Sequence, residues 1–219
     1  MNQRAKSLGM HNTNYVNPVG VPNEYLGEYA PENSNANDDN YTCAKDYVAL
    51  ATELVSKYPD IINHTKSAHI VIKEGTPYEE EFTGYLHSLP GTEYAYPGMD
   101  GLKTGSAVHG YNYTGTAKQD DTRLMEVILG VSEWEDKAAE YKRHIVGNAL
   151  LDKCFEEYEY RLILEKGNHI LDGKKVYVEE DLYDCVPKNF NPDDCIFNGG
   201  HDNRKFCSYA SLYNKLLVI

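Results

Sequence analysis

The chain has 219 residues, and its 34 acidic residues outnumber the 21 basic ones to give a formal net charge of −13. This length suits one large domain, or one medium domain followed by a small one. The negative charge disfavours binding to nucleic acid, which needs a basic surface, and to anionic membrane surfaces.

The first 58 residues predict helix, loop and helix. Residues 5–10 resemble the last turn of a helix that a glycine cap closes at Gly9. Residues 11–31 carry Asn, Pro and Gly at short intervals and predict a long loop, and residues 32–40 a mobile polar excursion. Thr42 is the expected N-cap of a helix that runs to about Tyr58, before Pro59. Its apolar face would comprise Tyr47, Ala51, Leu54, Val55 and Tyr58.

An antiparallel meander is expected next. Residues 68–72 predict a strand, followed by an acidic, glycine-punctuated hairpin region that extends to Pro90. A strand carrying Lys103 follows, and then two strands over residues 111–117 and 123–131, joined by a polar turn. The last strand is nearly all apolar, so we expect it to be central and covered on both faces.

A long helix is predicted to begin at a capping box formed by Ser132 and Glu135. Its expected apolar stripe comprises Trp134, Ala138, Tyr141, Ile145 and Ala149, and Trp134 is expected to be a core residue. A helix that follows a meander should pack across the sheet.

The composition changes after about Tyr158. Residues 160–164 and 182–186 predict strands, and Asp172-Gly173 predicts a hairpin turn between residues 169–171 and 176–178. The expected fold class is α+β, with a larger domain over residues 1–157 and a small all-β domain over residues 158–219 that ends in an irregular tail. The periodicity of residues 198–219 is too weak to assign elements.

Lysine and hydroxyl groups gather in a glycine-rich stretch, residues 97–106. Three glycines lie within eight residues, around Lys103, Thr104 and Ser106. A lysine beside hydroxyls is suited to holding a carboxylate or phosphate, although a simple glycine-rich turn before a strand explains the composition equally well. A phosphate loop needs glycine directly before the lysine, and Leu102 occupies that position.

Lys103-Thr104-Gly105 at the start of a strand, followed by a meander and a long helix, resembles the low-molecular-mass penicillin-binding proteins. These D-alanyl-D-alanine carboxypeptidases use the motifs S-x-x-K, S-x-N and K-T-G in that order. The likeness covers roughly residues 1–190 and also rests on residues 1–10, 13, 17–20, 42–46 (TCAKD), 89–91 (LPG), 98–105 (GMDGLKTG), 110–112 (GYN), 147–150 (GNAL) and 166–184. The last two segments resemble the Gram-positive branch, which carries a small β domain and can also act as a transpeptidase.

The resemblance implies a partial β-lactamase/transpeptidase-like fold in which the K-T-G strand forms one wall of the active site. Lys103 would be a catalytic residue that supplies positive charge and holds the proton network near the catalytic serines. The peptide stem of peptidoglycan would lie along the strand. Thr104 and Ser106 would hydrogen-bond the terminal carboxylate, while Gly105 permits a close approach. The Ser106 N–H would be one oxyanion-hole donor, a role worth roughly 2.7–4 kcal/mol. No cofactor is implied.

The catalytic serine is missing from this pattern. None of the nine serines begins S-x-x-K or S-x-N. We therefore expect the carboxy-terminal half of such an enzyme, inactive alone because it cannot form the acyl-enzyme. The strand at residues 123–131 would then have a bare edge, open to aggregation or to a separate first half.

The resemblance also predicts partners and a location. The partners would be a stem peptide ending in D-Ala-D-Ala and, in the complete enzyme, β-lactams. The full-length family acts at the extracellular face of the cytoplasmic membrane, but this sequence shows neither a signal peptide nor an apolar stretch long enough to cross a membrane. A different class of function remains open, a non-catalytic extracellular module that binds stem peptides or a partner protein.

Other residue patterns predict no site. The eight histidines contain no H-E-x-x-H, and the five cysteines, an odd number without a C-x-x-C pair, support neither a zinc site nor a disulfide framework. His109 follows the K-T-G motif closely, but a solvated loop position is the favoured interpretation. Residues 79–81, three glutamates in a row, favour a solvated turn over a cation site.

Overall fold

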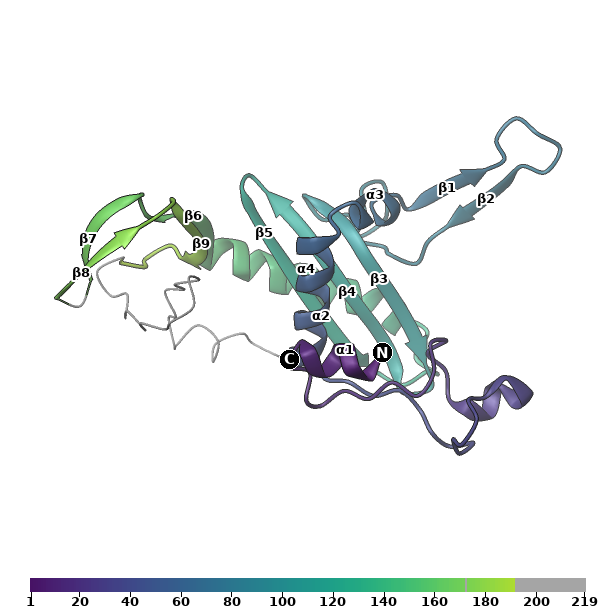
Figure 1. The fold of residues 1–219 in the computed structure, drawn as a ribbon. Coiled ribbons are helices and arrows are strands. Elements are labelled where there is room, and N and C mark those ends of the chain that lie inside the picture. The colour runs from purple at the N-terminus through teal and green to yellow at the C-terminus, as the bar shows by residue number, and fades with distance from the viewer. Residues whose placement is uncertain (172, 192–219) are drawn as a thin grey trace. The chain divides into compact units, whose positions relative to one another are not determined.

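The computed structural model describes residues 1–171 and 173–191, in two compact units. The first unit comprises Met1–Lys118 and Leu124–Leu151; the second comprises Gln119–Arg123 and the residues from Asp152 onward. Helices and antiparallel sheets occur together in the chain, which confirms the α+β class (Figure 1). The sequence-based statements on residues 195–219 lie outside the described residues.

The first helix, α1 (Asn2–Ser7), ends as its sequence predicts. Gly9 has φ +76°, its N–H donates to Lys6 O (3.1 Å), and Met10 N–H donates to Ala5 O (3.0 Å). These two bonds satisfy carbonyls that the end of a helix leaves unpaired, and glycine adopts the required positive φ without a Cβ clash. The glycine cap is confirmed.

Buried asparagines hold the long loop that follows, which contains two short 3₁₀ helices, η1 (Asn23–Tyr25) and η2 (Gly27–Tyr29). Asn17 Oδ1 accepts from the backbone N–H of Val19 and of Gly20, both at 3.0 Å, and Asn17 Nδ2 donates to Asn23 Oδ1 (3.0 Å). Asn40 Oδ1 accepts from Asn17 N–H (3.1 Å), and Asn40 Nδ2 donates to Asn17 O (2.9 Å). Side-chain amides therefore supply the hydrogen bonds that a sheet or helix would otherwise provide.

Helix α2 (Ala44–Lys57) ends just before Tyr58 and Pro59, as expected, and the short α3 (Ile61–Thr65) follows. Thr42 as the N-cap is wrong, because Cys43 occupies that position and the Thr42 hydroxyl lies 2.7 Å from the Thr13 hydroxyl instead. The buried carboxylate of Asp46 accepts from Asn12 N–H (2.7 Å) and from the Thr13 hydroxyl (2.9 Å). This side chain therefore anchors the start of the long loop to α2.

The predicted strands are present. Strands β1 (His69–Ile72) and β2 (Glu80–Thr83) pair as an antiparallel ribbon whose residues are all exposed. Strands β3 (Met99–Ala107), β4 (Gly110–Gln119) and β5 (Thr122–Val131) form an antiparallel sheet in the order β3-β4-β5.

The prediction that the strand over residues 123–131 is central is wrong. Within the described residues β4 is central and mostly buried, while β5 is an edge strand and only partly buried. The apolar residues of β5 therefore lie on an edge strand whose outer side pairs with no strand in the described part of the chain.

The long helix α4 (Ala139–Glu157) begins seven residues after Ser132, so the capping box is wrong. Ser132 adopts φ +57° and its hydroxyl donates to Asp136 Oδ2 (2.9 Å). The expected apolar stripe is also wrong: Trp134 is 42 %, Tyr141 39 % and Ile145 50 % exposed. The buried face comprises Ala139, Arg143, His144, Gly147 and Leu151.

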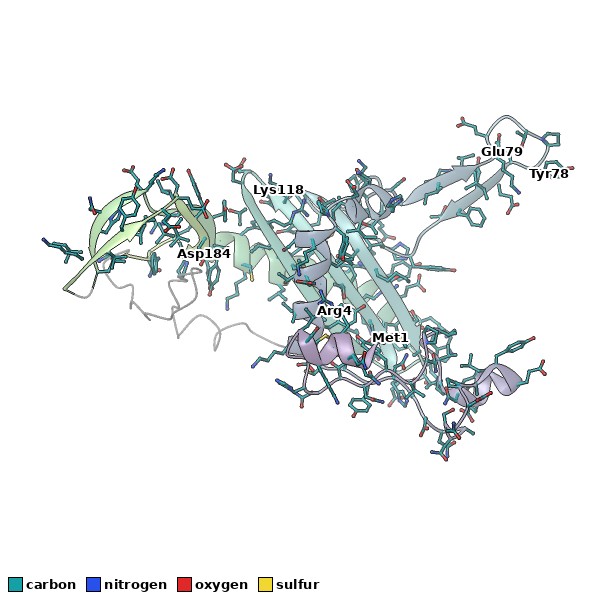
Figure 2. All side chains as sticks on the ribbon, viewed as in Figure 1. Met1, Arg4, Tyr78, Glu79, Lys118 and Asp184 are labelled. Carbon is teal, nitrogen blue, oxygen red and sulfur yellow. The ribbon has the colours of Figure 1, made fainter. Side chains whose placement is uncertain are left out.

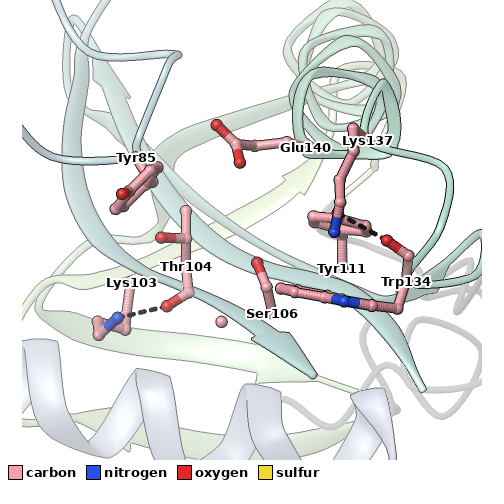
Figure 3. Close-up of a pocket in the computed structure, with 9 residues that line it drawn as sticks. Tyr85, Lys103, Thr104, Ser106, Tyr111, Trp134, Lys137 and Glu140 are labelled. Carbon is pink, nitrogen blue, oxygen red and sulfur yellow. Dashed lines mark hydrogen bonds between the residues drawn. The ribbon is translucent and has the colours of Figure 1, made fainter. Parts of the chain in front are cut away.

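Helix α4 packs against the sheet, as expected, because two glycines let the backbones approach. A Cβ on Gly147 would lie 2.5 Å from the Glu126 carboxylate of β5, and a Cβ on Gly115 of β4 would lie 2.6 Å from it. Helix α2 lies on the opposite face of the sheet (Figures 1 and 3). Figure 2 shows the side chains that these elements carry.

The described part of the second unit contains four strands, β6 (Tyr158–Leu164), β7 (Gly167–Leu171), β8 (Lys174–Val178) and β9 (Leu182–Pro187). β6 pairs with β9, and β7 pairs with β8. Its small core is formed by Ile163, Val186 and Phe190. In the described parts of both units, no helix is both long and apolar enough to cross a membrane.

Candidate functional site

Strand β3 presents the K-T-G residues along an open edge. β3 pairs with β4 on one side, with Lys103 opposite Thr114 and Ser106 opposite Tyr111, and no described strand pairs with its other side. Alternation along a strand places Thr104 and Ser106 on one face and Lys103 on the other. The exposed Lys103 ammonium donates to Thr104 O.

A pocket of about 360 Å³ adjoins this strand, and Figure 3 shows the side chains around it. Its lining brings together all four predicted site residues with five others, Tyr85, Tyr111, Trp134, Lys137 and Glu140. A Cβ added to Gly105 would meet no atom within 4 Å, so its space is open. Two lysines against one glutamate make the lining net positive, a suitable environment for an anionic ligand.

Trp134 belongs to this pocket and not to the core. Its ring stacks on Tyr111, with centroids 5.6 Å apart and planes inclined by 12°, and the Tyr111 hydroxyl donates to Trp134 O (3.2 Å). The Lys137 ammonium lies 3.5 Å from the centroid of the indole ring. The prediction of a core tryptophan is wrong because the chain turns at residues 133–138 before α4 begins.

A fully buried arginine lies behind β3. Arg143 Nη1 lies 3.1 Å from Asn112 O, 3.2 Å from Ser106 Oγ and 3.3 Å from Gly105 O. Its Nη2 donates to Tyr85 O (3.3 Å), and its Nε donates to His144 Nε2 (3.3 Å). Among the described residues no carboxylate forms an ion pair with Arg143. Burial lowers the pKa of this guanidinium, while Glu140 nearby favours its charge.

His144 links the arginine to the loop that carries Tyr85. Because His144 Nε2 accepts from Arg143, we assign the ring hydrogen to Nδ1, which lies 3.0 Å from Ser88 Oγ. Burial, reinforced by the Arg143 charge, lowers the pKa of His144 to about 3. The ring is therefore neutral, and the Ser88 hydroxyl in turn donates to Asn148 Oδ1 (3.0 Å).

This serine–histidine contact is not a catalytic pair. Ser88 and His144 are both fully buried, and neither lines the pocket. A nucleophile must reach its substrate and pass its proton to a base. Ser88 instead donates its hydrogen to Asn148, so the contact joins loop to helix.

The sequence prediction missed residues from other elements that line the pocket, such as Tyr85, or that support it from behind, such as Arg143. Tyr85 comes before β3 in the sequence and is separated from it by a long loop. The sequence pattern around Arg143 indicates only an ordinary polar position of an amphipathic helix. One signal was available: Gly147 lies one helical turn after Arg143 and marks the face where a helix packs closely. No group of three or more His, Cys, Asp or Glu residues that could hold a metal occurs in the described part of the chain. His109 is exposed in the β3–β4 turn, as predicted.

Comparisons with known proteins agree with this geometry. Residues 1–133 match the family described as D-alanyl-D-alanine carboxypeptidase (peptidase S11), and residues 160–201 match a domain of unknown function (DUF1958). A curated relative, D-alanyl-D-alanine carboxypeptidase DacF of Bacillus subtilis (strain 168), is 28% identical over 185 residues. That alignment covers 82% of this chain and 41% of the relative, so this chain spans less than half of its length.

Solved structures show the same fold. A peptidoglycan synthesis regulatory factor (PBP3) from Streptococcus pneumoniae is similar with a TM-score of 0.69 and 23% identity, over 86% of this chain and 54% of that one. Penicillin binding protein 6B from Escherichia coli is similar with a TM-score of 0.58 and 18% identity, over 85% of this chain and 48% of that one. The partial transpeptidase-like fold predicted from the sequence is confirmed.

Proposed function

The chain belongs to the D-alanyl-D-alanine carboxypeptidase family, and on this premise we propose that it supplies the substrate-binding half of a serine-type D-Ala-D-Ala carboxypeptidase site. One observation carries the proposal: Thr104 and Ser106 lie on a strand edge that no strand of the described residues pairs with, in a pocket that Lys103 and Lys137 also line. An extended peptide that ends in a carboxylate fits an open strand edge beside cations.

Each K-T-G residue then has a role. The stem peptide lies along β3, and its terminal carboxylate accepts hydrogen bonds from the hydroxyls of Thr104 and Ser106. Lys103 adds positive charge, and the open space at Gly105 admits the peptide backbone. The Ser106 N–H is one of two donors to the developing oxyanion, a role that typically contributes about 2.7–4 kcal/mol to acyl transfer.

The nucleophile comes from residues outside this chain, because the sequence contains no S-x-x-K. In the assembled site the serine oxygen attacks the penultimate D-Ala carbonyl, and the peptide bond to the terminal D-Ala breaks. The leaving amine takes a proton, and free D-Ala departs. Water then cleaves the acyl-enzyme to give the shortened stem, or an amine attacks it to give a crosslink. A penicillin acylates the same serine. This chemistry belongs to cell-wall peptidoglycan, outside the cytoplasmic membrane.

Two exposed surfaces of the first unit are suited to receive the nucleophile-bearing part. No strand in the described part of the chain pairs with the outer edge of β5, so this edge is a template for another strand. On α4, Tyr141, Ile145 and Val146 are exposed by 39 %, 50 % and 42 %. A partner that covers these side chains would bury apolar area that a monomeric surface rarely presents together.

The test has two arms. In the first, the chain is titrated with N-acetyl-D-Ala-D-Ala while backbone amide signals are followed by NMR, and shifts at residues 103–106 are expected. In the second, the chain is mixed with a separately produced polypeptide that carries S-x-x-K and S-x-N, and the mixture is labelled with a fluorescent penicillin. Label should appear on the added polypeptide, and only when both are present. Label on this chain alone would refute the proposal.

A further inference from the structure

Arg143 is a buried arginine whose contacts indicate a role beyond stabilising the fold. Its guanidinium is fully buried, has no ion-pair partner among the described residues, and directs one nitrogen at the strand that carries the pocket hydroxyls. A buried charge is costly unless its hydrogen bonds are satisfied. Here they are satisfied by backbone carbonyls of three segments, by the imidazole ring of His144 and by one side-chain hydroxyl, that of Ser106.

The contact with Ser106 sets the direction of the serine hydroxyl. Arginine has five N–H donors and no acceptor, so across the 3.2 Å contact Ser106 Oγ must be the acceptor. A hydroxyl has one hydrogen, and here that hydrogen is left for a partner on the pocket side. Donation from a charged group also polarises the O–H bond and strengthens its own donation.

We infer that Arg143 is a positioning residue for specificity: it makes Ser106 a hydrogen-bond donor that selects a carboxylate over a neutral terminus. This inference rests on the proposed function, because it deepens the role of the same pocket. A ligand with a terminal carboxylate accepts the Ser106 hydrogen. A terminal amide has one acceptor oxygen where a carboxylate has two, so the hydrogen of Thr104 or of Ser106 faces an N–H group and stays unpaired. The amide also lacks the negative charge that the lysines favour. A site with a fixed donor discriminates strongly against a ligand that leaves the donor unpaired.

The first arm of the test needs no ligand. The rotamer of Ser106 is measured from side-chain couplings by NMR in the wild type and in Arg143→Met and Arg143→Lys. One rotamer is expected in the wild type and in the lysine variant, which keeps a donor, and averaging is expected in the methionine variant. Lys142→Met, on the adjacent exposed position, is the matched control and should match the wild type. An unchanged Ser106 rotamer in Arg143→Met would overturn the inference.

The second arm compares N-acetyl-D-Ala-D-Ala with its C-terminal amide. Hydrogen bonds to charged groups predict that the wild type prefers the free acid about tenfold or more. Ser106→Ala and Arg143→Met should each reduce this preference to the level that the charges of the pocket lysines provide. The double variant should reduce it no further, because the two residues act through one hydroxyl. A purely structural arginine would weaken acid and amide equally, and additive losses would refute the coupling.

The experiments distinguish a failure of the proposed function from a failure of the inference about Arg143. If the wild type binds neither ligand, the proposed function fails for this chain, while the rotamer measurement still decides the role of Arg143. If Arg143→Met does not fold, Arg143→Leu replaces it, since a leucine side chain has no group that donates a hydrogen bond to Ser106 Oγ. The pairing of Lys103 with Thr114, followed by cross-strand NMR contacts, reports whether β3 and β4 remain joined in each variant.

Discussion

The buried carboxyl group of Glu126 should make the free energy of unfolding of this chain depend on pH. Its carboxylate is 2 % exposed, and neither oxygen has a hydrogen-bond partner within the part of the chain that the structure describes. The nearby Tyr113 hydroxyl donates to Met99 Sδ instead (3.3 Å). Burial raises the pKa of Glu126 to about 7, against a smaller opposing effect of Tyr113. The folded state therefore favours the protonated carboxyl.

The sign and size of this pH dependence follow from the linkage between proton binding and folding. A carboxyl whose pKa is raised in the folded state contributes stability that is fully present below its unfolded pKa and is lost as pH rises through the folded value. Between 4.5 and about 7 the shift corresponds to a loss of about 3 kcal/mol. Glu126→Gln removes this titration while preserving shape, so the variant should gain about 2 kcal/mol on the wild type between pH 5 and pH 8.

Urea denaturation of the chain at pH 5, 6, 7 and 8, followed by circular dichroism, measures this difference. Glu74→Gln, at an exposed position of the β1–β2 hairpin, is the control and should run parallel to the wild type. Taking the difference between variant and wild type cancels the other titrating groups. If that difference is the same at pH 5 and pH 8, the carboxylate of Glu126 is solvated or paired, and the reasoning fails.

Four further predictions concern single residues. Gly105→Ala should change the free energy of unfolding by less than about 0.5 kcal/mol, because the added Cβ meets no atom, yet it should weaken binding of N-acetyl-D-Ala-D-Ala. Gly98→Ala should lower the free energy of unfolding by about 1–3 kcal/mol or more. Gly98 has φ +78°, and an added Cβ would lie 2.1 Å from a backbone oxygen. His144 has its pKa lowered to about 3, so it contributes stability above pH 6.5 that is lost as pH falls toward 3, and His144→Gln should flatten the decline measured by urea denaturation over that range. Asp46→Ala should cost about 1–3 kcal/mol, measured in the same way, by leaving Asn12 N–H unpaired, and an unchanged midpoint would show that the loop is anchored elsewhere.

Local signals in the sequence predicted those parts of the fold that depend on neighbouring residues. Gly9 predicted the cap of α1, Pro59 the end of α2, and the meander its strands, because turn chemistry and alternation act over a few residues. The K-T-G residues were likewise recognised from their own order, and the structure brings all four to one pocket. Their roles there remain the proposals made above.

Only the tertiary structure decided which face of α4 is buried and what completes the pocket. Helical periodicity favoured the apolar residues Tyr141 and Ile145 as the inner face, yet Arg143 and His144 are buried there instead. The reason is that β3 and the loop at Tyr85 present carbonyls and a hydroxyl to α4, and a guanidinium satisfies them better than an apolar side chain. Burial follows the hydrogen-bonding needs of segments far apart in sequence, and residue order alone does not contain that information.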